Sequence, residues 1–216
     1  MLQYSTFVPS AMSSNVQTLF SQIADDLAEQ GLSEVNGFLS NAEADAILQA
    51  DEFKDGKLHF RKAGVGKTNK QIKEGIRGDY IQWIDPENGS AAELVYLSRL
   101  KGLISYLNQS LFLSLKGVEI HRTIYPVGTR YQRHIDQFQT DDHRKLSIIC
   151  YLNANWTTAE GGQLRLHLPE GFRDILPLSG KLVCFRSEMI EHEVLPATCE
   201  RYSLTGWAVD RDPDVH

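Results

Sequence analysis

The sequence predicts an α+β fold that is mainly β, with a jelly-roll core supported by N-terminal and central helices. Three observations predict it. Before residue 114 apolar residues recur at helical spacing, after it short runs rich in β-branched and aromatic residues follow one another, and Gly, Asn and Pro separate these runs. Short strands between frequent turns suit a jelly roll better than an α/β sheet.

Three amphipathic helices are expected in the first half of the chain. The first covers residues 16–27, whose apolar side chains share one face, and Gly31 stands at the position of a C-terminal cap. The second begins at Ser40 and ends near Phe53, and the third begins at Ser90. The second and third helices open with Ser-x-x-Glu, the spacing of a capping box.

Between the second and third helices, residues 61–78 contain four glycines and, beyond Arg61, five lysines or arginines. This stretch has little periodicity, so we expect a long, exposed, basic loop. Residues 80–84 are predicted to form a strand. Seven further strands are expected after residue 114, at 118–125, 131–135, 146–152, 163–168, 181–185, 193–195 and 202–209.

The bulk properties indicate one globular domain. We expect a single domain over residues 1–216, with helical support in 1–58, the loop and a helix in 59–113, and the jelly-roll core in 114–210. The net charge of -6 and the lack of a basic stripe argue against a nucleic-acid partner. The sequence contains no run of eighteen apolar residues, so no membrane span is predicted. Three dispersed cysteines fit reduced thiols in the cytoplasm.

Two residue types that bind metals lie in the β-rich half. His134 and Asp136 are two positions apart, which on a strand points both side chains to one face, and His192 follows near a late predicted strand. Two imidazoles and one carboxylate form the facial triad of non-haem iron(II) oxygenases, which leaves coordination positions open. A zinc hydrolase could use the same three residues, so this set alone does not fix the metal.

Arg201 favours the iron alternative. It lies nine positions beyond His192 on the last predicted strand, where an arginine facing a β-core needs a carboxylate partner. The dicarboxylate 2-oxoglutarate would be such a partner, and Thr205, on the same face of the strand, could donate a hydroxyl to it. The alternative is an internal salt bridge from Arg201 to Asp174 or Glu200.

The sequence resembles the catalytic domain of the oxygen-sensing prolyl hydroxylases, the type that acts on hypoxia-inducible factor. The resemblance covers most of the chain, from about Phe60 to Asp210. It is carried by Ile76-Arg77-Gly78-Asp79 through Trp83, Tyr125-Pro126, Tyr131-Gln-Arg133-His134-Ile-Asp136, Tyr151-Leu152-Asn153, Trp156, Gly161-Gly162-Gln-Leu-Arg165, His192-Glu193-Val194, Pro196 and Arg201 to Trp207.

The resemblance implies a double-stranded β-helix and assigns the site residues. It makes His134, Asp136 and His192 the ligands of Fe(2+). It implies that 2-oxoglutarate is bound by Arg201, Tyr151, Thr205 and Tyr125. Residues around the substrate would be Tyr131, Trp207, Arg77 and Lys145, the last standing where relatives usually have an arginine near the substrate groove. Aromatic packing within the strands is the alternative role of Tyr125, Tyr131 and Trp207.

The same resemblance implies the reaction. A dioxygenase would use Fe(2+), O2 and 2-oxoglutarate, with ascorbate as an additional reductant, to hydroxylate C4 of a prolyl residue, and would release succinate and carbon dioxide. The loop at 61–76 would fold over a substrate protein that presents proline in a flexible loop. The first forty residues contain no cysteine, so we expect a bacterial type of member without the N-terminal zinc-binding module of animal relatives.

Several alternatives for the function stay open at this point. For bacterial relatives, resemblance points to elongation factor Tu as the substrate protein. The nearest alternative is an oxygenase of a free amino acid or another small molecule. A third is a jelly-roll sensor or binding module without turnover, against which the retention of the four residues His134, Asp136, His192 and Arg201 argues.

Overall fold

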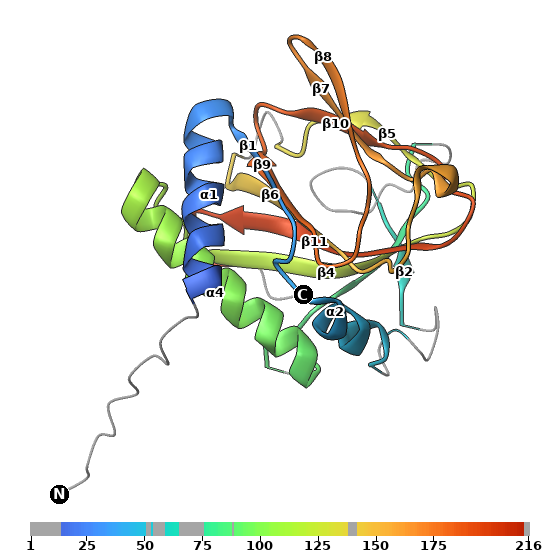
Figure 1. Cartoon of the computed structure of the whole chain (residues 1–216), viewed down its shortest axis with the longest axis horizontal. Coiled ribbons are helices and arrows are strands. Elements are labelled where there is room, and N and C mark those ends of the chain that lie inside the picture. The colour runs from blue at the N-terminus through green and yellow to red at the C-terminus, as the bar shows by residue number, and fades with distance from the viewer. Residues whose placement is uncertain are drawn as a thin grey trace, which may run out of the picture.

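The computed structural model describes residues 14–50, 53, 59–64, 76–87, 89–137 and 142–213. Within these ranges the chain forms two antiparallel β-sheets, and helices pack against the larger one (Figure 1). The larger sheet has the strand order β1-β9-β6-β11-β4-β3-β2, and the smaller sheet has the order β5-β10-β7-β8. The predicted mainly-β jelly roll with supporting helices is therefore confirmed.

The helices follow the capping signals of the sequence. They are α1 (Ser14–Gln30), α2 (Asn41–Leu48) and α4 (Ala91–Leu111), with a short 3-10 turn η2 (Thr158–Glu160). Ser40 and Ser90 each cap a helix and form the complete capping box with a glutamate three residues on. Gly31 has a φ of 70° after α1, a left-handed conformation in which glycine pays no steric penalty.

Most predicted strands are present within one or two residues of their expected bounds. The strands are β1 (Leu32–Val35), β2 (Arg61–Lys62), β3 (Tyr80–Trp83), β4 (Gly117–Tyr125), β5 (Tyr131–His134), β6 (Arg144–Tyr151), β7 (Leu164–Leu168), β8 (Gly171–Ile175), β9 (Leu182–Arg186), β10 (Glu191–Val194) and β11 (Arg201–Val209).

Three strands and one helix end differ from the prediction. The strands β1, β2 and β8 were not expected: β1 does not alternate between apolar and polar residues, β2 has only two residues, and β8 is exposed at its first four positions. The helix α2 ends at Leu48, before Phe53, because the Ala50 N–H bonds to Ile47 O and so turns more tightly than an α-helix. Of the predicted loop at 61–78, residues 65–75 lie outside the described residues.

Two apolar cores lie on opposite faces of the larger sheet. One joins that sheet to the helices, and the other lies between the two sheets. Strand β6 contributes to both, since Ile148 and Cys150 face the helices while Ile149 and Tyr151 face the smaller sheet. A strand buried on both faces has a continuous apolar sequence, as β6 has. The side chains of His134, Asp136, His192 and Arg201 lie on this second side, between the sheets.

A buried ion pair fixes α4 on this sheet. The Glu93 Oε1 atom lies 2.6 Å from Arg122 Nε on β4, and both side chains are almost completely buried. The same carboxylate closes the capping box at Ser90. One side chain therefore caps the helix and anchors it to the strand that leads to the site. Among the described residues, no helix is long and apolar enough to cross a membrane.

Candidate metal and cosubstrate site

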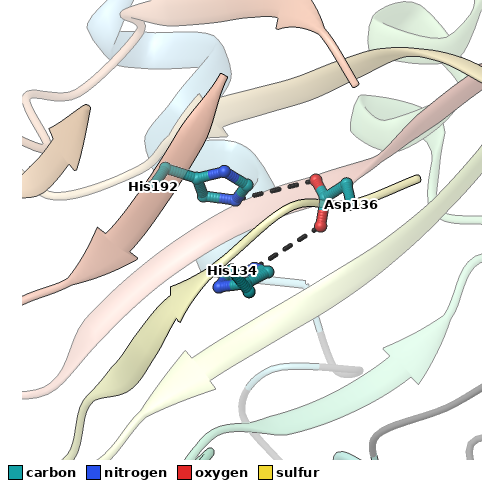
Figure 2. A group of neighbouring side chains, drawn as sticks. All are labelled: His134, Asp136 and His192. Carbon is teal, nitrogen blue, oxygen red and sulfur yellow. Dashed lines mark ion pairs between the residues drawn. The ribbon is translucent and has the colours of Figure 1, made fainter. Parts of the chain in front are cut away.

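Three side chains that could hold a metal ion converge between the sheets. His134 ends β5, Asp136 follows two residues later, and His192 lies on β10 directly opposite His134 in the antiparallel pairing. One nitrogen or oxygen from each residue lies within 4.8 Å of the others. Both imidazoles point toward the carboxylate, with Nε2 of His134 at 3.5 Å from Oδ1 and Nε2 of His192 at 3.7 Å from Oδ2 (Figure 2).

The backbone selects the tautomer of both histidines. Nδ1 of His134 lies 2.7 Å from the carbonyl oxygen of Gln132, and Nδ1 of His192 lies 3.1 Å from that of Ile190. A carbonyl oxygen only accepts hydrogen bonds, so Nδ1 carries the proton in each ring. The Nε2 lone pairs therefore face the centre of the site, as metal ligation requires.

Burial and charge keep the ligands in the states that bind metal. Burial lowers the pKa of His192 to about 4, so its imidazole is neutral at pH 7. Burial alone would raise the pKa of Asp136, but His192, His134 and a hydrogen bond from Ser147 outweigh it and hold that pKa well below its ordinary value. The site thus offers two imidazole nitrogens and one carboxylate, the donor set of the facial triad.

Next to this triad lies a cavity of about 440 Å³ that extends between the sheets. Its walls come from β4, β6 and β11 of the larger sheet and from β5, β7 and β10 of the smaller sheet. Of the residues singled out in the sequence, it is lined by Arg77, Tyr125, Tyr131, His134, Asp136, His192, Arg201, Thr205 and Trp207. The structure therefore brings together residues from five separate segments of the chain.

Arg201 is a buried cation without a carboxylate partner in the described part of the chain. Arg201 is 2% exposed, and its guanidinium carbon lies 5.1 Å from the ring centre of Tyr125 and 4.9 Å from that of Tyr151. Its Nε atom is buried without a hydrogen-bond partner. Asp174 pairs with Arg165 and Glu200 accepts from the Tyr202 hydroxyl, so neither forms the alternative salt bridge. A buried guanidinium with an unsatisfied N–H group fits an anionic ligand.

Polar groups beside Arg201 complete this end of the cavity. Burial raises the pKa of Tyr151 to about 12 and that of Tyr125 well above its ordinary value, so both hydroxyls stay protonated and can donate. The Thr205 and Ser203 hydroxyls are 3.0 Å apart on β11. Arg201 and Tyr125 are register partners across β11 and β4. These groups suit the carboxylate of a ligand such as 2-oxoglutarate.

The residues expected around the substrate do not all lie in the cavity. Tyr131, Arg77 and Trp207 line it, but Lys145 does not, and its ammonium lies 3.0 Å from Asp210. The arginine of this wall is Arg144, whose guanidinium carbon is 3.4 Å from the ring centre of Trp207. The expectation for Lys145 is corrected accordingly.

A β-bulge explains why Lys145 faces away. In the pairing of β6 with β11, Leu146 pairs with Ala208 and Arg144 with the next residue, Val209, so that Lys145 is passed over. An extra residue in one strand shifts the alternation of side chains between the faces of the sheet. The sequence shows no glycine or proline here that would have marked the bulge.

Two further residues of the site escaped the sequence analysis. Ser147 donates its hydroxyl to Asp136 Oδ2 at 2.7 Å, and its signal was a lone polar residue in the apolar run of β6. His121 is buried in the cavity wall, 2.8 Å from the Thr123 hydroxyl and edge-on to Trp83. Burial holds its pKa well below the ordinary value, so this imidazole is neutral. A single histidine in a strand gave no signal of its place.

Comparisons with known proteins agree with this geometry. The sequence profile of the 2OG-Fe(II) oxygenase superfamily matches residues 119–209. Human prolyl hydroxylase EGLN3 is 32% identical over 202 residues, which cover 86% of this chain and 81% of the relative. Human Egl nine homolog 1 is 35% identical over 179 residues, covering 79% of this chain and 40% of the relative.

Two solved structures are similar throughout. A prolyl-4-hydroxylase from Pseudomonas putida is 40% identical with a TM-score of 0.81, and covers 89% of this chain and 99% of its own. A prolyl hydroxylase from Trichoplax adhaerens, in complex with a peptide fragment of the oxygen degradation domain of hypoxia inducible factor, is 30% identical with a TM-score of 0.82. That match covers 91% of each chain.

A jelly roll with two histidines and an aspartate beside a buried, unpaired arginine defines an iron(II)- and 2-oxoglutarate-dependent dioxygenase. Within this class, the chain belongs to the prolyl hydroxylase family. The cofactors of the class are Fe(2+), 2-oxoglutarate and O2. The donor set at the triad fits the metal, and the orphaned Arg201 Nε fits the dicarboxylate.

Proposed function

We propose that this chain hydroxylates C4 of prolyl residues in a protein substrate and converts 2-oxoglutarate to succinate and carbon dioxide. The observation that carries the proposal is that one cavity has both a candidate metal site and a candidate carboxylate site. A facial triad lies beside it, and an unpaired buried guanidinium lines its wall. The guanidinium favours the iron alternative over a zinc hydrolase, because it offers a binding group for the dicarboxylate cosubstrate.

For the metal and the cosubstrate we propose the following roles. Fe(2+) would be held by His134, Asp136 and His192. When bound, iron and 2-oxoglutarate supply the oxidising chemistry of the class. Arg201 would bind the distal carboxylate of 2-oxoglutarate, with Tyr151, Thr205 and Tyr125 as further hydrogen-bond donors. The chain itself contributes orientation, exclusion of water and a fixed charge distribution around the reacting centre.

Aromatic rings in the cavity wall suit a prolyl ring. Trp207 and His121 both line the cavity, with ring centroids 5.9 Å apart. The Arg144 guanidinium covers part of the Trp207 ring, which leaves the rest of the indole for an apolar contact with a pyrrolidine ring. We therefore propose Trp207 as a contact of the target proline, with Tyr131 and Arg77 as further residues of the substrate site.

Positive charge at the cavity favours an acidic peptide. Arg77, Arg133 and Arg144 all line it, although Arg133 pairs with Glu191 and Arg77 with Asp79. Complementary charge speeds encounter and selects partners. A substrate protein with a proline in a flexible, acidic loop fits this surface. By resemblance to bacterial relatives we propose elongation factor Tu as the first protein to test.

The proposed compartment is the cytoplasm. The three cysteines, Cys150, Cys184 and Cys199, are free thiols. Burial raises the pKa of Cys150 and Cys184, which keeps both thiols protonated and unreactive. Reduced, unpaired cysteines are usual in that compartment.

The test is incubation of purified chain with Fe(2+), 2-oxoglutarate and elongation factor Tu or a lysate, followed by mass spectrometry for one added oxygen on proline. Asp136→Ala should abolish both this product and succinate release, because it removes a metal ligand. Hydroxylation of free proline as fast as of a loop peptide would show a small-molecule oxygenase instead. Wild-type protein that binds partners without any turnover would refute the enzyme.

A further inference from the structure

The metal ligand His134 is stacked on an aromatic ring. The centres of the His134 and Tyr131 rings are 3.6 Å apart and the planes differ by 19°. The other histidine is held differently, because His192 is 5% exposed and lies edge-on to the core residue Phe185 at 4.8 Å. The His134 side chain is 17% exposed and sits at the end of its strand, so it lacks such a core neighbour.

Tyr131 is in turn held by an arginine. The guanidinium carbon of Arg77 lies 4.7 Å from the centre of the Tyr131 ring, within the range of a cation–π contact. Arg77 makes a two-pronged ion pair with Asp79, with Nε to Oδ1 at 2.6 Å and Nη2 to Oδ2 at 2.8 Å. The Asp79 side chain is fully buried, so the guanidinium has one preferred position.

The backbone reinforces this arrangement. Residues 76–78 pair with residues 130–132 next to β5: the Gln132 N–H bonds to Ile76 O at 2.9 Å and the Gly78 N–H to Arg130 O at 3.0 Å. Gly78 permits the approach, since a Cβ there would come within 2.6 Å of the Thr129 side chain. The segment that carries Arg77 is therefore fixed against the strand that carries His134.

We propose that Asp79, Arg77 and Tyr131 form a positioning unit that sets the plane of the His134 imidazole and so raises the affinity of the metal site. The inference rests on the proposed metal centre, and it gives Tyr131 and Arg77 a role in holding a metal ligand in place. The hydrogen bond from Nδ1 to Gln132 fixes one edge of the ring, and the stack on Tyr131 fixes its face. A ligand held in place loses less side-chain entropy when the metal binds.

The test measures Mn(2+) affinity by electron paramagnetic resonance, without 2-oxoglutarate or substrate. Tyr131→Leu should bind Mn(2+) about 3- to 10-fold more weakly, in line with the energy of an aromatic pair. Tyr131→Phe keeps the ring and should stay within about twofold of the wild type. Arg77→Gln should weaken the affinity by about two- to fivefold, as expected for a cation–π contact.

The matched control is Phe172→Leu. Phe172 also lies under an arginine, with Arg165 at 4.2 Å from its ring centre, but on the exposed strand β8 and outside the cavity. This variant should bind Mn(2+) like the wild type. Thermal unfolding of the metal-free variants identifies any that fail to fold. If Tyr131→Leu is one of them, Arg77→Gln decides, and an Mn(2+) affinity equal to that of the wild type then refutes the positioning unit.

The outcomes separate this inference from the proposed function. If Tyr131→Leu binds Mn(2+) as tightly as the wild type, or if Tyr131→Phe loses as much as Tyr131→Leu, the ring does not position the ligand. If the wild type itself binds no Mn(2+), the metal centre is wrong and the proposed function falls with it. A rise in the peptide KM with unchanged Mn(2+) affinity would assign Tyr131 to the substrate alone.

Discussion

Ser147 and Asp136 are joined by a 2.7 Å hydrogen bond from the serine hydroxyl to Oδ2. The Ser187 hydroxyl lies 2.9 Å from the same serine oxygen. Because Ser147 uses its proton on the carboxylate, Ser187 must be the donor in the second bond. A chain of two hydroxyls therefore orients the carboxylate between the two imidazoles.

Removal of this hydrogen bond should weaken metal binding. Ser147→Ala leaves Asp136 free to rotate, and loss of a partner that orients a metal ligand typically costs about 10- to 100-fold in affinity. Titration with Mn(2+) measures the effect. Ser187→Ala acts one bond further from the carboxylate and should cost less. Equal affinity of Ser147→Ala and the wild type would show that the carboxylate is held by the histidines alone.

Arg201 should control the affinity for 2-oxoglutarate. Arg201→Gln removes a charge-assisted interaction worth about 1.5–3 kcal/mol, which corresponds to about 10- to 150-fold weaker binding. Calorimetric titration with 2-oxoglutarate in the presence of Mn(2+) checks this. Arg165→Gln is the control, because Arg165 pairs with Asp174 at the surface. An unchanged affinity of the Arg201 variant would place the cosubstrate elsewhere.

Side-chain alternation along single strands could be predicted from the sequence. It placed Arg201 on the same face as Thr205, because both lie on β11 and the pair depends on a period of two. It also placed His134 and Asp136 together, although Asp136 lies two residues beyond the end of β5. The capping boxes at Ser40 and Ser90 were equally local. Each of these predictions needs a few adjacent residues and no knowledge of the partner strand.

Which strands pair, and in which register, could not be predicted from side-chain alternation. The pairing that sets His192 opposite His134 joins β10 to β5, 58 residues apart, and it follows from the packing of the whole sheet. The resemblance to relatives supplied it instead. The bulge at Lys145 is also a property of two strands, since it depends on the register of β6 against β11. Because the bulge skips one residue, the position in the cavity wall that was assigned to Lys145 is taken by Arg144.

The positions of Arg144 and Lys145 predict that only Arg144 affects substrate binding. Arg144 covers the Trp207 ring in the cavity wall, whereas Lys145 pairs with Asp210 outside it. Arg144→Ala should raise the KM for a proline peptide by about three- to tenfold, as loss of a contact of this strength implies. Lys145→Ala, one residue on, should leave it unchanged. Steady-state kinetics with both variants decides the matter, and the reverse pattern would restore Lys145 to the substrate groove.

The stability of the helical support should depend on acid pH through Glu43. Its carboxylate lies 2.7 Å from Arg99 Nη2, an ion pair that joins α2 to α4. The hydrogen bond from Arg99, with those from Ser40, lowers the pKa of Glu43 from 4.5 to about 2. As the pH falls, the unfolded chain therefore takes up this proton before the folded chain does, so the stabilisation is complete above about pH 4.5 and is lost toward pH 2.

Comparison of urea unfolding for the wild type and Glu43→Gln tests this window. The variant should be less stable at pH 7, by less than about 1 kcal/mol, because solvent screens a pair that is only partly buried. The difference in unfolding free energy should shrink between pH 4.5 and pH 2. If the difference in unfolding free energy between the two proteins stays constant over that range, the charge of Glu43 does not cause it. Glu43 would then act through its capping hydrogen bonds, which glutamine retains only in part.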